Sequence, residues 1–262
     1  MRDFYAASSP VPLDQADGLR RLFAGQRRHL LVLAANPHVP FAGVVLDRIA
    51  QHLAADGREV LVVDAAAGAP AAPELVRLDL TAGIERIAER VSYLPARGLP
   101  LAHVDTRGSA SGFVDALHAA APATEVFVLH AEGSDLARML MRRAARPLLI
   151  GADHPESIKH AYAMAKLLAR RTGLATFDLL LAASAQSPRA GAIAASLGSC
   201  IENFLGGLLH DWTLVDPAGS AHDAAGLTRL LDAQLALDGL AGLDLPAAAS
   251  RPIPGSAPSA FR

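Results

Sequence analysis

The chain has 262 residues, 52% of them hydrophobic, and its 24 basic and 26 acidic residues give a net charge of −2. This size and composition predict one sizeable α/β domain, and the charge argues against a general nucleic-acid binder, which needs a clustered basic excess. A single cysteine, Cys200, excludes a disulfide framework and a cysteine-based metal cluster. Because we find neither a signal peptide nor an apolar run long enough to span a bilayer, we expect a cytoplasmic protein.

The N-terminal part predicts a disordered arm over residues 1–12, followed by a short amphipathic helix from Leu13 to about Ala24. Asp14 is a plausible N-cap for this helix, and Gly25 ends it. Four apolar residues share one face of it at helical spacing: Ala16, Leu19, Leu22 and Phe23. We therefore divide the chain into an N-terminal arm with its helix (1–25), an α/β domain (26–240) and a disordered tail (241–262).

Strands and helices alternate through the middle of the chain. Continuous apolar runs predict buried strands at 29–35, 59–64, 91–94, 126–130, 147–151, 177–182 and 212–215. Helices are predicted at about 42–55, 112–120, 134–145, 155–171, 188–197, 200–209 and 224–237. This alternation is typical of an α/β fold with a doubly wound, mostly parallel sheet and helices on both faces, to which the short N-terminal helix is added.

The loop after the first strand lies where a doubly wound protein commonly binds a phosphate. It consists of Asn36, Pro37, His38, Val39, Pro40, Phe41, Ala42 and Gly43. A phosphate loop needs glycines, free N–H groups and a lysine, whereas two prolines here lack an N–H and no lysine precedes Lys159. Losing these contacts would cost on the order of 5 kcal/mol of phosphate binding. The loop is interpreted as an ordinary strand-to-helix connection, and a cryptic nucleotide loop is the alternative.

Four segments together resemble the MinD/ParA group of P-loop ATPases, and within it the flagellar-number branch called FlhG, FleN or YlxH. They are the Asp-Gln-Ala-x-x-Leu-Arg pattern at 14–20, the strand–loop–helix unit ending in Val60-Leu61-Val62-Val63-Asp64, Tyr93-Leu94-Pro95-Ala96, and the strand–Pro-Glu–helix block at 147–168. The likeness spans about residues 14–216. It implies a MinD-like P-loop NTPase fold.

The departures from this family concern its nucleotide ligands. By spacing, Pro37 replaces the family's signature lysine, Ala42 the P-loop lysine and Gly43 the magnesium-binding threonine. Ala66 replaces a second acidic residue, and His130 stands where a Walker B aspartate would end a strand. Of the ligands, Asp64 alone remains. The sequence therefore predicts a vestigial nucleotide pocket at residues 36–43 and Asp64, with no catalytic residue, no metal and no cofactor, and thus a pseudo-ATPase rather than an enzyme.

The resemblance also implies a partner. In the FlhG branch the Asp-Gln-Ala helix engages the signal-recognition-type GTPase FlhF and stimulates its GTP hydrolysis. The implied contact residues here are Asp14, Gln15, Ala16, Leu19, Arg20 and Leu22. A glutamine can orient an attacking water, an arginine can stabilise charge on a transferring phosphoryl group, and leucines can anchor a helix in a groove. The alternative is that this helix packs on the chain's own core.

Three functions remain open on these grounds. The first is a non-catalytic regulator of flagellar number or placement, cytoplasmic or recruited to the cell pole or inner membrane by its partner, which also opposes a flagellar transcription regulator. The second is a weak MinD-like ATPase that uses ATP and magnesium and cycles on the membrane. The third is an adaptor of another assembly. Direct nucleic-acid contact is not expected, and helix 227–240 is a poor lipid-binding candidate because Asp232 and Asp238 oppose Arg229.

Overall fold

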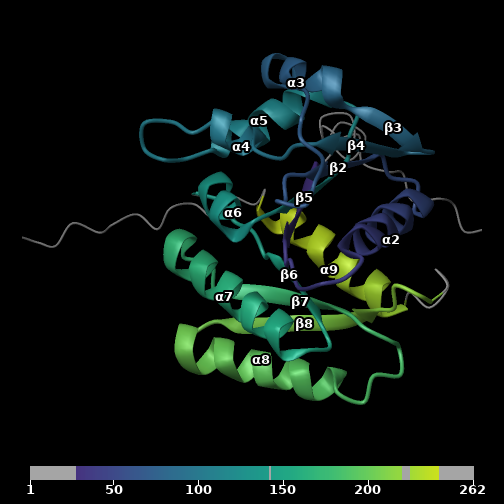
Figure 1. Ribbon diagram of the computed structural model, residues 1–262, viewed down its shortest axis with the longest axis vertical. Helices are drawn as coiled ribbons and strands as arrows, with labels where there is room; N and C mark the ends of the chain where they lie inside the picture. The colour runs from purple at the N-terminus through teal and green to yellow at the C-terminus, as the bar shows by residue number, and fades with distance from the viewer. Residues whose placement is uncertain (1–27, 142, 220–224, 242–262) are drawn as a thin grey trace, which may run out of the picture.

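The computed structural model describes residues 28–141, 143–219 and 225–241. The predicted N-terminal helix, including the Asp-Gln-Ala pattern, lies outside these residues, and so does the predicted C-terminal tail. Within them the chain forms an eight-stranded sheet of order β3-β4-β2-β5-β1-β6-β7-β8 (Figure 1). Every neighbouring pair is parallel except β3 and β4. This confirms the predicted α/β class and mostly parallel sheet.

Every strand except β3 lies where an apolar run predicts one. Their bounds are β1 (His29–Ala34), β2 (Val60–Asp64), β3 (Glu85–Ala88), β4 (Val91–Pro95), β5 (Val126–Ala131), β6 (Leu148–Ala152), β7 (Thr176–Ala182) and β8 (Leu208–Val215). All six residues of β5 and all five of β6 are buried. A strand covered on both faces has no solvent side, which explains why these segments read as continuous apolar runs rather than alternating ones.

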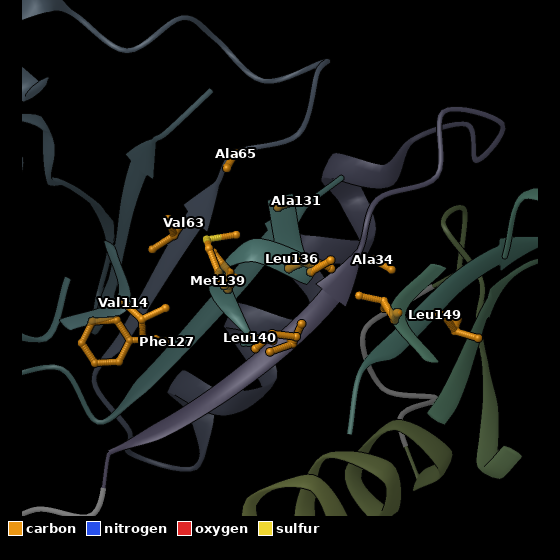
Figure 2. Packing of buried hydrophobic residues seen from close by; sticks show 14 of the residues in the cluster. Ala34, Val63, Ala65, Val114, Phe127, Ala131, Leu136, Met139, Leu140 and Leu149 are labelled. Atoms are coloured by element: carbon orange, nitrogen blue, oxygen red, sulfur yellow. The ribbon is translucent and has the colours of Figure 1, made fainter. Parts of the chain in front are cut away.

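Helices cover both faces of the sheet. Their bounds are α2 (Ala42–Ala55), α3 (Glu74–Leu78), the 3₁₀ turn η1 (Leu80–Gly83), α4 (Leu99–Ala102), α5 (Ser111–Ala120), α6 (Gly133–Met139), α7 (Pro155–Thr172), α8 (Ala190–Leu205) and α9 (Ala225–Ala241). One core cluster joins the sheet to α5, α6, α7 and α8, and a second joins the opposite face to α2 and α9 (Figure 1). Figure 2 shows Leu136 and Met139 of α6, and Leu140 directly after it, lying over the strands in the first cluster.

The C-terminal helix α9 packs on the sheet. Four of its leucines are buried in the second core cluster: Leu227, Leu230, Leu231 and Leu235. No helix in the described ranges has the length and apolar character needed to cross a membrane.

The structure corrects the prediction of two helices at 188–197 and 200–209. They form the single helix α8, because the buried positions Ala190, Ala194, Leu197 and Ile201 continue one stripe past Gly198. The helix ends at Gly206, whose φ of 61° suits the left-handed conformation that glycine adopts without strain. The residues after it belong to β8, which is therefore longer than predicted. Short elements with weak periodicity, namely α3, η1, β3 and α4, were not predicted.

A buried ion pair at the amino-terminal edge of the sheet joins β7 to the segment before β6, and a hydrogen bond from α9 completes it. Asp178 of β7 is fully buried, and its Oδ2 lies 2.7 Å from Nε of Arg146. Gln234 of α9 donates to the same oxygen at 2.7 Å. Burial raises the pKa of Asp178, and Arg146 is the largest influence opposing that rise. The acidic residue within an apolar strand is the sequence signal for such a pair, since a buried charge requires a partner.

Candidate functional site

The candidate site lies at the carboxyl ends of four adjacent central strands, β2, β5, β1 and β6. Residues that follow parallel strands meet at one edge of the sheet, and ligands of doubly wound folds bind there where the chain order reverses. The loop at residues 36–41 follows β1, and Asp64 ends β2. The structure therefore brings the predicted pocket residues to one edge, as the resemblance implies.

Asn36 anchors the loop to the neighbouring strand and helix. Its side chain is 4% exposed, and its Nδ2 lies within donating distance of the Ile150 carbonyl at 2.8 Å, the Ser157 carbonyl at 2.9 Å and the Ser157 hydroxyl at 3.1 Å. Ser157 is itself fully buried, and its hydroxyl accepts from the amide of Ala152. The loop start is thus fixed to the junction of β6 and α7, a role that the sequence did not reveal.

The rest of the loop has few amides to offer a phosphate. The amide of His38 donates to the Asn36 side chain at 3.1 Å, and the amide of Val39 donates to the Asn36 carbonyl. Pro37 and Pro40 have no N–H. As it stands, residues 36–40 do not fit a phosphate cradle of the usual kind, which uses several backbone amides at once.

Phe41 is the most unusual residue of the loop. Its φ of 60° lies in the left-handed region, which is strained for a bulky side chain, and that side chain is 70% exposed. α2 begins directly after it at Ala42, and a Cβ built on Gly43 would meet no atom within 4 Å. The beginning of α2 therefore has room for larger side chains.

Asp64 and His130 pair across adjacent strands. Nδ1 of His130 lies 2.9 Å from Oδ1 of Asp64, and the same oxygen accepts the Ala66 amide at 3.2 Å. Asp64 therefore caps the turn that follows β2 and also holds the His130 ring. Tyr93 also hydrogen-bonds Asp64, and burial together with this carboxylate raises the pKa of the Tyr93 phenol to about 12.

His130 occupies the place at which the sequence resemblance expected a Walker B aspartate. The ring is 5% exposed, and its Nε2 is buried without a hydrogen-bond partner among the described residues. Asp64 fixes its orientation, because a histidine bound through one nitrogen presents the other in a defined direction. The sequence placed His130 at a strand end but could not pair it with a residue 66 positions earlier.

Three further histidines gather beside the loop. The His38 ring lies 5.6 Å from the His160 ring and 6.5 Å from the His154 ring, measured between centroids. Glu156, four residues before His160 on α7, contacts Lys159 at 2.8 Å. Across the described ranges, no group of three or more histidine, cysteine or acidic side chains is arranged to hold a metal ion.

A mostly apolar cavity of about 560 Å³ adjoins the histidines between α7 and α8. Ile158, Tyr162, Ile193 and Leu197 line it, together with His154 and the half-buried Cys200. His154 therefore contacts the loop and also lines this cavity.

Comparison with known proteins identifies the fold. No protein-family model and no curated protein matches the chain. Among solved structures, cobyrinic acid a,c-diamide synthase from Mycobacterium smegmatis with a bound ATP analogue and magnesium matches with a TM-score of 0.56 and 17% identity, over 79% of this chain and 94% of that one. A plasmid partition protein from Borrelia burgdorferi bound to AMPPNP matches with a TM-score of 0.53 and 8% identity, over 83% of this chain and 100% of that one. The MinC:MinD cell division complex of Aquifex aeolicus matches with a TM-score of 0.52 and 12% identity, over 83% of this chain and 97% of that one.

The comparison contradicts the prediction that the chain is not an enzyme. Its structural neighbours belong to a group of ATPases, and they include a synthase and a partition protein that hold ATP analogues. The prediction rested on the missing P-loop lysines and on Ala66 and His130 standing in place of acidic residues. At these identities the likeness establishes architecture rather than function. The chain has the fold of the MinD/ParA P-loop ATPases.

Proposed function

We propose that the chain is a MinD/ParA-type regulator of the FlhG kind, which stimulates GTP hydrolysis by an FlhF-like signal-recognition GTPase. The observation that carries the proposal is the Asp-Gln-Ala-x-x-Leu-Arg pattern at 14–20, followed directly by a domain with the MinD/ParA fold. The combination of pattern and fold favours this branch over an adaptor of another assembly.

The proposed contact uses chemistry that GTP hydrolysis needs. Gln15 would orient the attacking water in the partner's site, and Arg20 would stabilise the charge that develops on the transferring phosphoryl group. Leu19 and Leu22 would hold the segment in an apolar groove of the partner. A flagellar transcription regulator is proposed as a further partner. Recruitment to the cell pole or inner membrane would then follow from the GTPase rather than from a lipid anchor of the chain itself.

GTP turnover by the cognate FlhF-like GTPase tests this function. We expect the full chain to raise turnover, and Gln15→Ala and deletion of residues 1–25 each to abolish most of the increase, because catalytic groups supplied in trans contribute about 10³-fold or more in related systems. Phe204→Ala is the matched control, because Phe204 is exposed on α8, far along the chain from the N-terminal pattern. Absence of any stimulation by the intact chain would refute the partner assignment.

An ATP-dependent function is the second candidate, favoured by the nucleotide-bound neighbours of the same fold. The turnover assay therefore runs both without ATP and with excess ATP and magnesium. Stimulation that requires ATP would mean that the chain's own pocket acts as the switch. Stimulation that ignores ATP would mean that the N-terminal segment acts alone.

Restoring two family ligands should strengthen ATP binding. Because Ala42 is only half-buried and Gly43 has open space beyond its Cα, Ala42→Lys combined with Gly43→Thr can be accommodated at the start of α2. One charged hydrogen bond contributes about 1.5–3 kcal/mol, so we expect a gain of roughly 10- to 100-fold in affinity for magnesium-ATP by calorimetric titration. Ala42→Met with Gly43→Thr is the uncharged control. Equal affinities for both double variants would disprove the alignment of this loop with a P-loop.

A further inference from the structure

The strand β8 lies at one end of the sheet and pairs on one side. In the described ranges its only neighbouring strand is β7, to which it runs parallel. At the other end of the sheet, β3 has four residues and includes Glu85 and Arg86, whereas β8 has eight residues and is mostly apolar. A long apolar edge strand presents amides and carbonyls to which another strand can add, so stable proteins protect such edges.

The hydrogen bonds of β8 show which of its residues face outward. The Val215 carbonyl accepts from the amide of Ala183, the residue directly after β7. The Asp211 amide donates to the Asp178 side chain of β7 at 3.0 Å. Because the backbone groups of a strand alternate in direction from one residue to the next, Trp212 presents its amide and its carbonyl to the outer edge.

Two side chains occupy these outward groups of Trp212. The Trp212 amide donates to Oδ1 of Asp211 at 2.8 Å, and the Trp212 carbonyl accepts from Nη2 of Arg229 at 3.1 Å. The same Nη2 also donates to Asp211 Oδ1 at 2.8 Å, which closes a ring of hydrogen bonds. A residue of an added antiparallel strand would offer Trp212 one acceptor and one donor. Asp211 and Arg229, here called the edge cap, already supply both.

The edge cap protects the part of β8 that is otherwise regular. The register between β7 and β8 shifts at His210, which lies opposite no residue of β7. Such a bulge bends an edge strand away from an incoming one. From Asp211 to Val215 the register is unbroken, so the bulge gives no protection there. The Arg229 side chain is 63% exposed, and solvent and salt therefore weaken its ion pair with Asp211 enough for the cap to open.

We propose that the Asp211–Arg229 edge cap is a removable block that keeps β8 from pairing with the β8 strand of a second copy of this chain. A two-fold axis relates two such strands as an antiparallel pair, in which the two Trp212 residues exchange both hydrogen bonds. Leu208, which is 54% exposed on the same strand, adds apolar surface to this edge. The cap goes beyond the proposed GTPase partnership and does not depend on it.

Analytical ultracentrifugation of the full chain over a range of concentrations tests the edge cap. We expect Asp211→Ala combined with Arg229→Ala to dimerise at roughly tenfold lower concentration than the wild type, because each of the two paired edges has lost one exposed ion pair. Hydrogen exchange locates the contact. The Trp212 amide of the double variant should exchange faster than in the wild type when the protein is dilute, and slower once the dimer forms. Unchanged association, or association that leaves the Trp212 amide unprotected, would overturn the proposal.

Three further variants separate the cap from surface charge in general. Glu156→Ala combined with Lys159→Ala is the matched control, because it removes an exposed ion pair of the same 2.8 Å length from α7 and should associate as the wild type does. Asp211→Asn keeps an acceptor for the Trp212 amide and should lie between the wild type and the double variant. Arg229→Ala alone should give a smaller increase in association, and it carries the test if the double variant does not fold. Association of the control equal to that of the capless variant would refute the cap.

Discussion

Arg146→Met is expected to lower the free energy of unfolding by about 3–5 kcal/mol at neutral pH, because it leaves a buried carboxylate without its counter-charge. Asp178 is fully buried and lies 2.7 Å from the Arg146 guanidinium, so solvent cannot take over the lost interaction. The Gln234 side chain, the backbone amide of Asp211 and the His210 ring still contact the carboxylate, but they do not replace the charge of the guanidinium. Urea unfolding followed by circular dichroism measures the loss.

The pH dependence of Arg146→Met provides a second check. Burial already holds the pKa of Asp178 above its ordinary value, and without Arg146 it should rise further. An acid with a raised folded pKa contributes stability that is fully present below its unfolded pKa, about 3.9, and lost as the pH rises through the folded value. The deficit of Arg146→Met relative to the wild type should therefore be smaller at pH 4.5 than at pH 8.

Arg229→Met is the matched control for this pair. Arg229 contacts Asp211 at 2.8 Å, but its side chain is 63% exposed, so screening should limit the loss to below about 1 kcal/mol. Equal losses for Arg146→Met and Arg229→Met would show that burial does not govern the Asp178 pair.

Phe127→Ala should lower the free energy of unfolding by about 3–5 kcal/mol, the range found when a large aromatic side chain is removed from a packed core. Phe127 is fully buried on β5, between β1 and β2, and Figure 2 shows it beside Val114 of α5. Its ring also lies 4.7 Å from that of His118, centroid to centroid. Neighbours on two strands and a helix cannot all move to fill the space, so the cavity should persist.

Phe204→Ala provides the same chemical change at the surface. Phe204 is 74% exposed on α8, and its removal should change stability by no more than about 0.5 kcal/mol. Thermal unfolding of both variants measures the difference. A loss for Phe204→Ala as large as that for Phe127→Ala would mean that α8 is covered by an interface in solution.

Most of the architecture could be predicted from local patterns. β1, α2 and β2 lie within one residue of their predicted bounds, because a buried parallel strand and an amphipathic helix each have a characteristic distribution of apolar residues. The wrong and missed elements also have causes in the local sequence. Gly198 interrupted the pattern of α8 without interrupting its buried stripe, and β3, with all four residues exposed, carries no hydrophobic signal.

The candidate site was predicted only in outline. The sequence placed residues 36–43 and Asp64 at one edge of the sheet, because residues after parallel strands must meet there. It did not pair Asp64 with His130, and it treated His38 as one member of a degenerate loop. These contacts depend on which strands are neighbours and on their register, and hydrophobic patterns encode neither.

The sequence by itself determined the class of fold, the positions of the central strands and the loss of the usual phosphate-binding residues, since each depends on residues close together in the chain. The tertiary structure alone decided that His154 caps α7 while bonding the His38 carbonyl, and that Arg146 neutralises Asp178. The physical reason is the same in both cases. A buried polar group needs a partner of defined geometry, and only the folded arrangement of distant segments determines which group that partner is.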